Sequence, residues 1–344
     1  MQKEIIDSGV LLNDQGKLTQ VGWARHQNLD CNLEKVNFYQ IKFLQKFRVK
    51  RWDYYAIFTP RRFFSATIAD LGYAGNIFVY TLNFKTGDLY EEGIVVPLGK
   101  NIDLPRNSTQ GNAHFSNKNL SLDFELEDNV RKLTVSWPGF HDNLGIEAEI
   151  SLAQPDEHES INIVIPIGSK RFYYNRKINC LPASGRIQYG EEKEILSPES
   201  SLGSLDWGRG VWEYSSFWKW ASASGFLADG RTIGVNMGGG FGDTSQASEN
   251  AFFINGILHK LDTVTIDYSP ENYTAPWYFS DNHDRLSLEF VPFKERVAET
   301  KLGVIDSEVH QIFGHYSGHV VCDNGERIEV KDLVGFAEDH KARW

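Results

Sequence analysis

Apolar and polar residues alternate along much of this chain, and the alternation predicts β-strands in both halves. Residues 120–126, 133–137, 146–152 and 161–165 place apolar side chains mostly at every second position. Because neighbouring side chains of a strand point to opposite faces, each segment can bury one face and leave the other in water. Strands of this kind build curled antiparallel sheets or barrels.

Asn-Gly and Asp-Gly pairs punctuate the C-terminal half. They stand at residues 229–230, 255–256 and 324–325, each between two strand-like runs. Both residues of such a pair accept a positive φ, which favours two-residue type I′ hairpin turns. Weaker turn signals at residues 86–88 and 127–129 predict hairpins in the N-terminal half as well. The spacing therefore predicts antiparallel sheet throughout.

Helical periodicity is scarce. Residues 33–47 fit helical spacing, but their aromatic side chains leave this segment open between helix and strand. The tail, residues 334–344, has acidic residues before basic ones and is interpreted as one short helix. A polar, proline-containing stretch near residues 196–202 is the expected boundary. We therefore predict an all-β protein of two consecutive antiparallel barrels or curled sheets, formed by residues 1–198 and 199–344.

The amino-acid composition also predicts a pocket. Of the 344 residues, 41% are hydrophobic and 24% are charged, which is typical of a globular protein and excludes disorder. Aromatic residues reach 13%, so we expect rings to line a pocket as well as to fill the core. No apolar stretch approaches the roughly 20 residues of a membrane-spanning helix.

Charge and cysteine content limit the classes of partner and the cellular compartment that we expect. The chain has 35 Lys and Arg against 46 Asp and Glu, a formal net charge of −11, and an acidic chain repels the phosphates of nucleic acids. The basic run at residues 46–51 predicts a strand with one solvated face. Cys31, Cys180 and Cys322 are far apart in the sequence, so we expect neither disulfides nor a thiolate zinc site. The first residues lack the apolar core of a signal peptide, and we expect a cytoplasmic protein.

Residues 205–222 concentrate charged side chains among tryptophans. One interpretation is a tryptophan-rich barrel floor in which Asp206 and Arg209 pair internally. The other is an aromatic cavity that holds Asp206 as an acid, since burial raises the pKa of a carboxyl group. We take Asp206 as a catalytic candidate. The substrate-binding candidates in this segment are Trp207, Arg209, Trp212, Trp218 and Trp220.

A glycine-rich segment, residues 238–243, precedes Glu249 and Asn250. Its glycines lack the G-x-G-x-x-G spacing of a dinucleotide loop, and no apolar helix follows them. We interpret them as letting a strand bend or approach another backbone closely. Glu249 and Asn250 then lie on a loop at the mouth of a cavity, and both are substrate-binding candidates.

Residues 307–319 contain an acid and three histidines. On a strand, Glu308 and His310 point to the same face, and a carboxylate beside an imidazole orients a general acid or base. The alternatives are a histidine held by hydrogen bonds in the core, or a metal bound by Glu308, His310 and His315. We choose Glu308 and His310 as catalytic candidates that surround one cavity with Asp206. We expect no metal, nucleotide or haem cofactor.

The acid–histidine cluster of the tail makes His340 a further substrate-binding candidate. The alternative is a tail that docks against the protein and closes a barrel.

Several long motifs resemble a known family. They are IADLGY at residues 68–73, LDWGRGVW at 205–212, GGGFGD at 238–243 with ENA at 249–251, SEVHQIFG at 307–314 and AEDHKARW at 337–344. Over nearly its whole length the chain resembles the family catalogued as domain of unknown function 2804. More distantly it is similar to the calycin group that includes carotenoid 1,2-hydratases and tocopherol cyclases. That resemblance implies two successive lipocalin-like barrels.

Two classes of function remain open. In the first, the chain is a cofactor-independent acid–base enzyme of hydratase, isomerase or cyclase type, and it acts on a small apolar or amphipathic substrate whose cationic centre is stabilised by Trp faces. Carboxylates with Trp platforms also suit a carbohydrate-active enzyme. In the second class, the barrels only bind such a small molecule, as lipocalin-type cavities do. Carboxylates inside the cavity favour an enzyme, whereas a wholly apolar cavity favours a binding protein.

Overall fold

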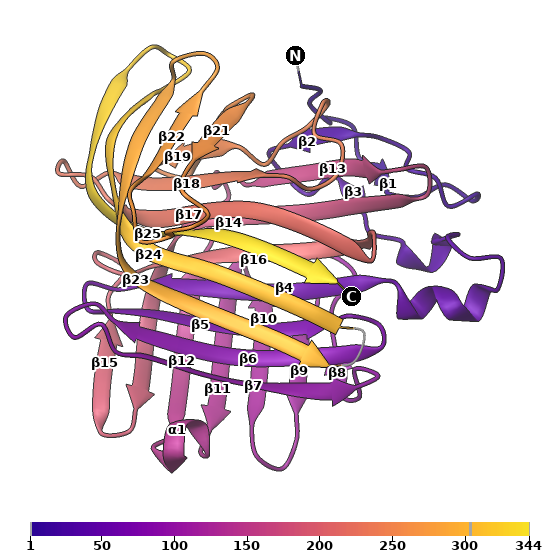
Figure 1. The fold of residues 1–344 in the computed structure, drawn as a ribbon, viewed down its shortest axis with the longest axis horizontal. Coiled ribbons are helices and arrows are strands. Elements are labelled where there is room, and N and C mark those ends of the chain that lie inside the picture. The colour runs from indigo at the N-terminus through magenta and orange to yellow at the C-terminus, as the bar shows by residue number, and fades with distance from the viewer. Residues whose placement is uncertain (1, 303–304, 344) are drawn as a thin grey trace.

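The computed structural model describes residues 2–302 and 305–343, and nearly all of their regular structure is β-strand (Figure 1). Two large antiparallel sheets contain almost all of the strands. The prediction of an all-β fold with two curled antiparallel sheets is confirmed. No helix formed by the described residues is long and apolar enough to cross a membrane.

The first sheet has the strand order β7-β6-β5-β4-β16-β14-β12-β11-β10-β9-β8, with β13 and β15 paired to β14 and β2 paired to β13. Its strands are β2 (Gly22–Ala24), β4 (Lys50–Phe58), β5 (Arg62–Asp70), β6 (Ala74–Asn83), β7 (Leu89–Pro97), β8 (Ile102–Asp103), β9 (Ala113–Ser116), β10 (Ser121–Glu127), β11 (Val130–Trp137), β12 (Ile146–Ala153), β13 (Ile161–Ile167), β14 (Arg171–Tyr189), β15 (Glu192–Leu196) and β16 (Leu202–Val211). A short parallel pair and three single-turn or two-turn helices complete this part: β1 (Gly9–Val10), β3 (Leu29–Asp30), the 3₁₀ helices η1 (Leu33–Lys35) and η2 (Lys42–Phe47), and α1 (Phe140–Asn143).

The second sheet has the order β20-β19-β18-β17-β25-β24-β23-β22-β21. Its strands are β17 (Ser215–Phe226), β18 (Thr232–Gly239), β19 (Ala251–Ile254), β20 (Ile257–Lys260), β21 (Val264–Asp267), β22 (Trp277–Asp281), β23 (Leu286–Leu302), β24 (Ile305–Val321) and β25 (Arg327–Arg343).

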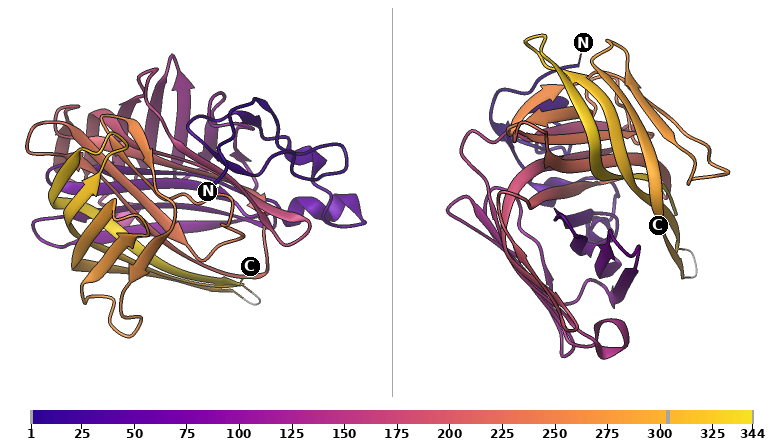
Figure 2. Two further views of the ribbon diagram at one scale, coloured as in Figure 1. Left: turned by 90° about the horizontal axis from the view of Figure 1, so that it is seen from above. Right: turned by 90° about the vertical axis from the view of Figure 1, so that its left-hand side faces the viewer.

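The long strands β23, β24 and β25 cross over β4–β7 of the first sheet (Figure 1), and Figure 2 shows how strongly the second sheet curls to do so. The register between β23 and β24 shifts after Pro292, and the register between β24 and β25 shifts near Gly318. Such bulges bend a strand and increase its twist. The crossing is held by contacts between the sheets, among them the ion pair of Arg296 on β23 with Glu91 on β7 at 2.5 Å.

The hairpins at the three Asn-Gly and Asp-Gly pairs are confirmed, but their predicted turn type is correct at only one of them. At Asn255-Gly256 the φ angles are 50° and 78°, and the strands pair directly on either side of the two residues. Around Gly230 and Gly325 the last strand pairs leave five-residue connections, in which only the glycine has a positive φ. The predicted hairpins at residues 86–88 and 127–129 are also present, as β6–β7 and β10–β11.

Two helical interpretations are resolved by the structure. Residues 33–47 contain the two short 3₁₀ helices and no strand. The tail helix is wrong, because residues 327–343 form β25, which lies between β17 and β24. Six consecutive residues of this strand, 335–340, are buried because both faces are covered there, so the alternation that marks a strand is missing from this part of its sequence.

The change from one sheet to the other falls between Val211 and Ser215. The strand that follows the expected boundary at residues 196–202 is β16, and it pairs with β4 and β14 of the first sheet. Each sheet has its own apolar cluster, and two further clusters rich in aromatic rings join the sheets.

Candidate functional site

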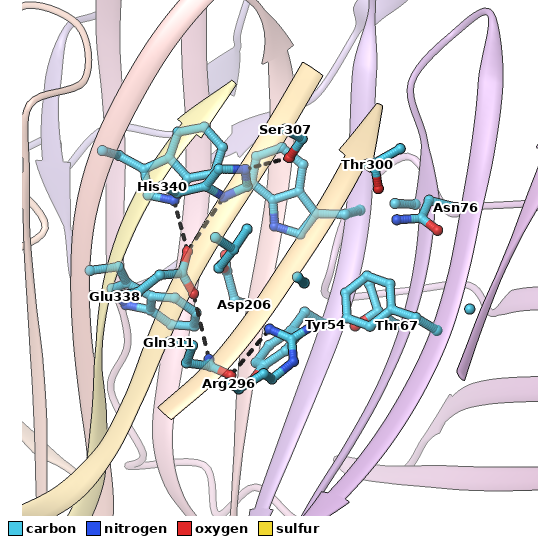
Figure 3. A pocket seen from close by; sticks show the side chains of 18 of the residues that line it. Tyr54, Thr67, Asn76, Asp206, Arg296, Thr300, Ser307, Gln311, Glu338 and His340 are labelled. Atoms are coloured by element: carbon cyan, nitrogen blue, oxygen red, sulfur yellow. Dashed lines mark hydrogen bonds and ion pairs between the residues drawn. The ribbon is translucent and has the colours of Figure 1, made fainter. Parts of the chain in front are cut away.

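A cavity of about 560 Å³ lies between the two sheets (Figure 3). Its lining comes from β4–β7, β14 and β16 of the first sheet, from β17 and β23–β25 of the second, and from loops beside them. A cavity of this volume holds an organic molecule of drug size. Aromatic rings form much of its wall: Trp52, Tyr54, Phe78, Tyr80, Tyr173, Trp212, Trp218, Trp220 and Phe241.

Strand alternation decides which side chains reach this cavity. On β24 the lining residues are Ser307, Val309 and Gln311, and on β25 they are Glu338 and His340. The residues between them point to the opposite face of the second sheet, because side chains alternate along a strand. This face is turned away from the cavity and is called the outer face, although part of it is covered by other residues of the second sheet.

A lysine between two carboxylates forms a charged part of the wall. Lys177 Nζ lies 2.9 Å from Asp206 Oδ2 and 3.3 Å from Glu249 Oε2. The same nitrogen lies 3.8 Å from the centroid of the Trp220 ring. Asn175 Nδ2 donates a hydrogen bond to the other oxygen of Asp206, at 2.7 Å. Burial by itself lowers the pKa of Lys177, but attraction and hydrogen bonds to the two carboxylates raise it above the ordinary lysine value, so this side chain remains a cation.

His340 has a polar neighbour at each of its ring nitrogens (Figure 3). Nε2 lies 2.8 Å from Ser307 Oγ, and Nδ1 lies 3.6 Å from Glu338 Oε1. The ring also packs on Trp218, whose indole N–H donates to the same Glu338 oxygen at 3.1 Å. A neutral imidazole with its proton on Nδ1 directs that proton toward Glu338, and its Nε2 lone pair can accept a second proton. This arrangement is typical of a general base or acid.

Gln311 connects the histidine to the first sheet. Its Oε1 accepts a hydrogen bond from the Tyr80 hydroxyl at 2.8 Å, and its Nε2 lies 3.5 Å from Glu338 Oε2. The Tyr80 hydroxyl also lies 2.8 Å from the Tyr54 hydroxyl. Burial raises the pKa of Tyr80 to about 12, so its phenol stays neutral and can donate.

The structure brings six of the sequence-predicted site residues to this one cavity. They are Asp206, Trp212, Trp218, Trp220, Glu249 and His340. Three substrate-binding candidates do not line it. Trp207 and Arg209 lie on the opposite face of β16, and Asn250 accepts a hydrogen bond from the Gly238 N–H inside the second sheet.

The internal pairing of Asp206 with Arg209 is wrong. Arg209 is fully buried and pairs with Asp53 at 2.8 Å, while its guanidinium lies over the Trp207 ring at 4.4 Å. Asp206 and Arg209 are three positions apart on an extended strand, an odd spacing that places them on opposite faces.

The expectation that Asp206, Glu308 and His310 surround one cavity is also wrong. His310 Nδ1 lies 2.7 Å from Glu295 Oε1 and its Nε2 lies 2.9 Å from Glu308 Oε1, on the outer face of the second sheet. Its ring stacks on Tyr273 at 4.3 Å. Burial tends to lower the pKa of His310, but the two carboxylates raise it above the ordinary value, and the hydrogen bond from His310 lowers the pKa of Glu308. The odd-numbered residues 307–311 of β24 therefore face the cavity, and the even-numbered ones do not.

In the alternative interpretation, Glu308, His310 and His315 bind a metal. The structure does not group His315 with the other two residues. His315 Nδ1 lies 3.4 Å from the carbonyl oxygen of Asp332. Within residues 2–302 and 305–343, no three His, Cys, Asp or Glu side chains are grouped as a metal site requires.

Sequence reasoning missed Lys177, Ser307, Gln311 and Glu338. Lys177 lies in a strand whose other residues gave no sign of a site, and its partners come from distant segments. Ser307 and Gln311 were within the motif that was singled out, in the register opposite to Glu308 and His310. Choosing between the two registers required the neighbouring strands.

Comparisons with known proteins agree with this fold. The model of the family described as Domain of unknown function (DUF2804) matches residues 2–344. The solved structure of CghA with Sch210972 superposes with a TM-score of 0.56 at 10% identity, over 86% of this chain and 88% of that chain. A protein described as AttH from Nitrosomonas europaea has a TM-score of 0.52 at 13% identity, over 86% and 93% of the two chains. Kievitone hydratase from Nectria haematococca has a TM-score of 0.52 at 15% identity, over 86% and 88%. At these identities the likeness establishes the fold alone, and no curated protein sequence matches the chain.

Proposed function

Since the chain belongs to the DUF2804 family, whose description names no activity, we propose a function from its cavity. We propose that the protein is an enzyme that moves protons to and from a small, largely apolar molecule held between the two sheets. The reaction class is hydration, isomerisation or cyclisation, and its proton transfers use side chains of this chain alone.

The observation that carries this proposal is the setting of His340. An imidazole that faces an organic-sized cavity, with a hydroxyl 2.8 Å from Nε2 and a carboxylate 3.6 Å from Nδ1, has the arrangement of an oriented acid–base group. In our proposal His340 exchanges a proton with the substrate through Nε2, and Ser307 relays it. Glu338 helps to orient the ring.

Lys177 and its two carboxylate partners have a supporting role in this proposal. Lys177 is held as a cation by Asp206 and Glu249, so it places a fixed positive charge in a wall of rings. An ammonium group has three N–H donors, so one of them can donate a hydrogen bond to a substrate oxygen while the other two face the carboxylates. Its carboxylate partners keep it from losing its proton.

The nature of the lining defines the substrate class that we propose. Nine aromatic rings and 560 Å³ of space suit a molecule with a planar or polycyclic apolar body. Five lining residues are Asp or Glu against two that are Lys or Arg, so an anionic substrate is disfavoured. Kievitone hydratase, which shares the fold, is by its name a hydratase, and this supports the reaction class without assigning the substrate.

Isotope incorporation tests the proposal across many candidate substrates at once. The protein is incubated in D₂O or H₂¹⁸O with a panel of uncharged unsaturated aromatic ketones and phenols, and mass spectrometry detects deuterium or an added water. We expect at least one class of compound to be labelled. His340→Asn should slow labelling by about 10²- to 10⁴-fold, the usual contribution of a general acid or base.

His310→Asn is the matched control, because this histidine is on the adjacent strand but on the outer face. It should leave the labelling rate unchanged. Equal losses in His310→Asn and His340→Asn would contradict the assignment of the cavity histidine. Ligands that bind tightly, are never labelled and are unaffected by His340→Asn would instead identify a small-molecule binding protein.

A further inference from the structure

Two arginines are buried on the face of the first sheet that carries its apolar cluster, and neither has a carboxylate partner. Arg131 on β11 and Arg176 on β14 are 4% and 3% exposed. Among the described residues, no ion pair includes either of them, and their hydrogen-bond acceptors are all neutral. Arg62, which is 5% exposed in the same sheet, follows the usual rule that a buried charge is paired, since it contacts Glu192 and Glu194.

Both guanidinium groups meet at Ser108. Arg131 Nη2 donates to the Ser108 carbonyl oxygen at 2.8 Å, and Arg176 Nη1 donates to the Ser108 hydroxyl at 3.1 Å. The remaining contacts of Arg131 are to the Gln154 amide oxygen at 3.1 Å and the Tyr55 hydroxyl at 3.5 Å. Two like charges are therefore brought together around one neutral residue.

A buried carboxylate on this face, that of Asp53, does not balance these charges. Asp53 is already paired with Arg209 at 2.8 Å. Burial, and then repulsion from Arg131, lower the pKa of Arg176 to about 9, which still leaves Arg176 protonated at neutral pH. Two uncompensated charges in a core are costly, because desolvation is not offset by an opposite charge.

Unused hydrogen-bond donors lie in the same cluster. Arg131 Nε and Gln27 Nε2 are buried and have no acceptor. The Gln27 side chain belongs to the cluster because its oxygen accepts from both the N–H and the hydroxyl of Ser108, each at 2.8 Å. Buried donors without acceptors, combined with excess positive charge, are what an anion requires.

We propose that a small monovalent inorganic anion of the chloride class binds beside Ser108 between Arg131 and Arg176, with Arg131 Nε and the Gln27 amide among its donors. A monatomic anion suits this position, since Ser108 and both arginines are less than one tenth exposed. The site is separate from the cavity, because Arg176 is adjacent to Lys177 on β14 and so points to the opposite face. The anion offsets one of the two positive charges and ties β11, β14 and the loop around Ser108 together.

Thermal unfolding of the full chain tests this site. Melting temperature is measured at constant ionic strength while sodium chloride replaces sodium gluconate, whose anion is too large to enter. We expect a saturable rise of about 2–5 °C, because a ligand that binds only the folded state stabilises it. Sodium bromide should reproduce the rise, and anomalous diffraction from bromide-soaked crystals should place one ion within hydrogen-bond distance of both guanidinium groups.

Arg176→Met should abolish the chloride dependence, while Arg62→Met, which removes a buried but paired arginine, should retain it. Superimposable chloride and gluconate curves for the wild-type protein would overturn the proposal, as would bromide-soaked crystals without an ion beside Ser108. If Arg176→Met does not fold, these two wild-type measurements still decide the matter.

Discussion

Removing the ammonium group of Lys177 tests the electrostatic design of the cavity. The change is Lys177→Met, which keeps most of the side-chain length and removes the charge. At an effective dielectric constant of about 20, the attractions over 2.9 Å and 3.3 Å to Asp206 and Glu249 are each about 5–6 kcal/mol, and desolvation of the three groups offsets much of this. Breaking a buried ion pair by removing one partner usually costs about 3–5 kcal/mol, and we expect a loss of unfolding free energy in this range at pH 8.

The loss should depend on pH in a defined direction. Without the lysine, Asp206 and Glu249 are two buried carboxylates with no cation between them, so protonating either one stabilises the folded variant. The difference in stability between Lys177→Met and the wild type should therefore shrink as the pH falls from 8 to 5. Urea denaturation followed by tryptophan fluorescence at both pH values measures it.

Two further variants serve as controls for this prediction. Adding Asp206→Asn to Lys177→Met should recover part of the loss at pH 8, because one of the stranded charges is gone. Lys301→Met removes a lysine from an exposed pair with Glu299 and should leave the transition unchanged. A loss below about 1 kcal/mol for Lys177→Met at pH 8, or an equal loss at pH 5, would refute the reasoning.

Two other predictions follow from the pKa shifts. The raised pKa of His310 means that its contacts with Glu295 and Glu308 stabilise the fold fully below the unfolded-state pKa of about 6.5 and lose this effect as the pH rises through the folded-state value. His310→Gln should thus cost about 0.5–1 kcal/mol at pH 5.5–6 and less at pH 9, as measured by thermal or urea unfolding, and a larger cost at pH 9 would contradict the assignment. Burial raises the pKa of the Cys31 and Cys180 thiols to about 12, so of the three free thiols these two should react with Ellman's reagent only after unfolding. Rapid reaction of more than one thiol in the native protein would show that at least one of the two is accessible.

The site illustrates how far sequence patterns reach. The tryptophan-rich segment identified Asp206 and three of the cavity's rings, because charged residues among many tryptophans are unusual in plain β sequence. The same kind of reasoning chose Glu308 and His310, which do form the expected carboxylate–imidazole pair. That pair lies on the outer face, where it packs on Tyr273.

Local pattern by itself determined the class of the fold. Alternation and turn residues act over two to five positions, so the sequence alone was sufficient for the all-β fold, the hairpins and the type I′ turn at Asn255-Gly256. The tail was misjudged as a helix because residues 335–340 of β25 are covered on both faces and carry no alternation. A pattern that depends on one solvated face disappears when neither face is solvated.

Only the tertiary structure decided which register of β24 and β25 faces the cavity. A shift by one residue exchanges Gln311 for His310 and His340 for Asp339, and both faces carry polar residues, so the sequence offers no preference. The choice is made by pairing with β17 and β23 and by the rings of the first sheet across the cavity. Lys177 likewise meets Asp206 and Glu249 only when strands from both sheets are assembled, because attraction between charges depends on distance in space and not along the chain.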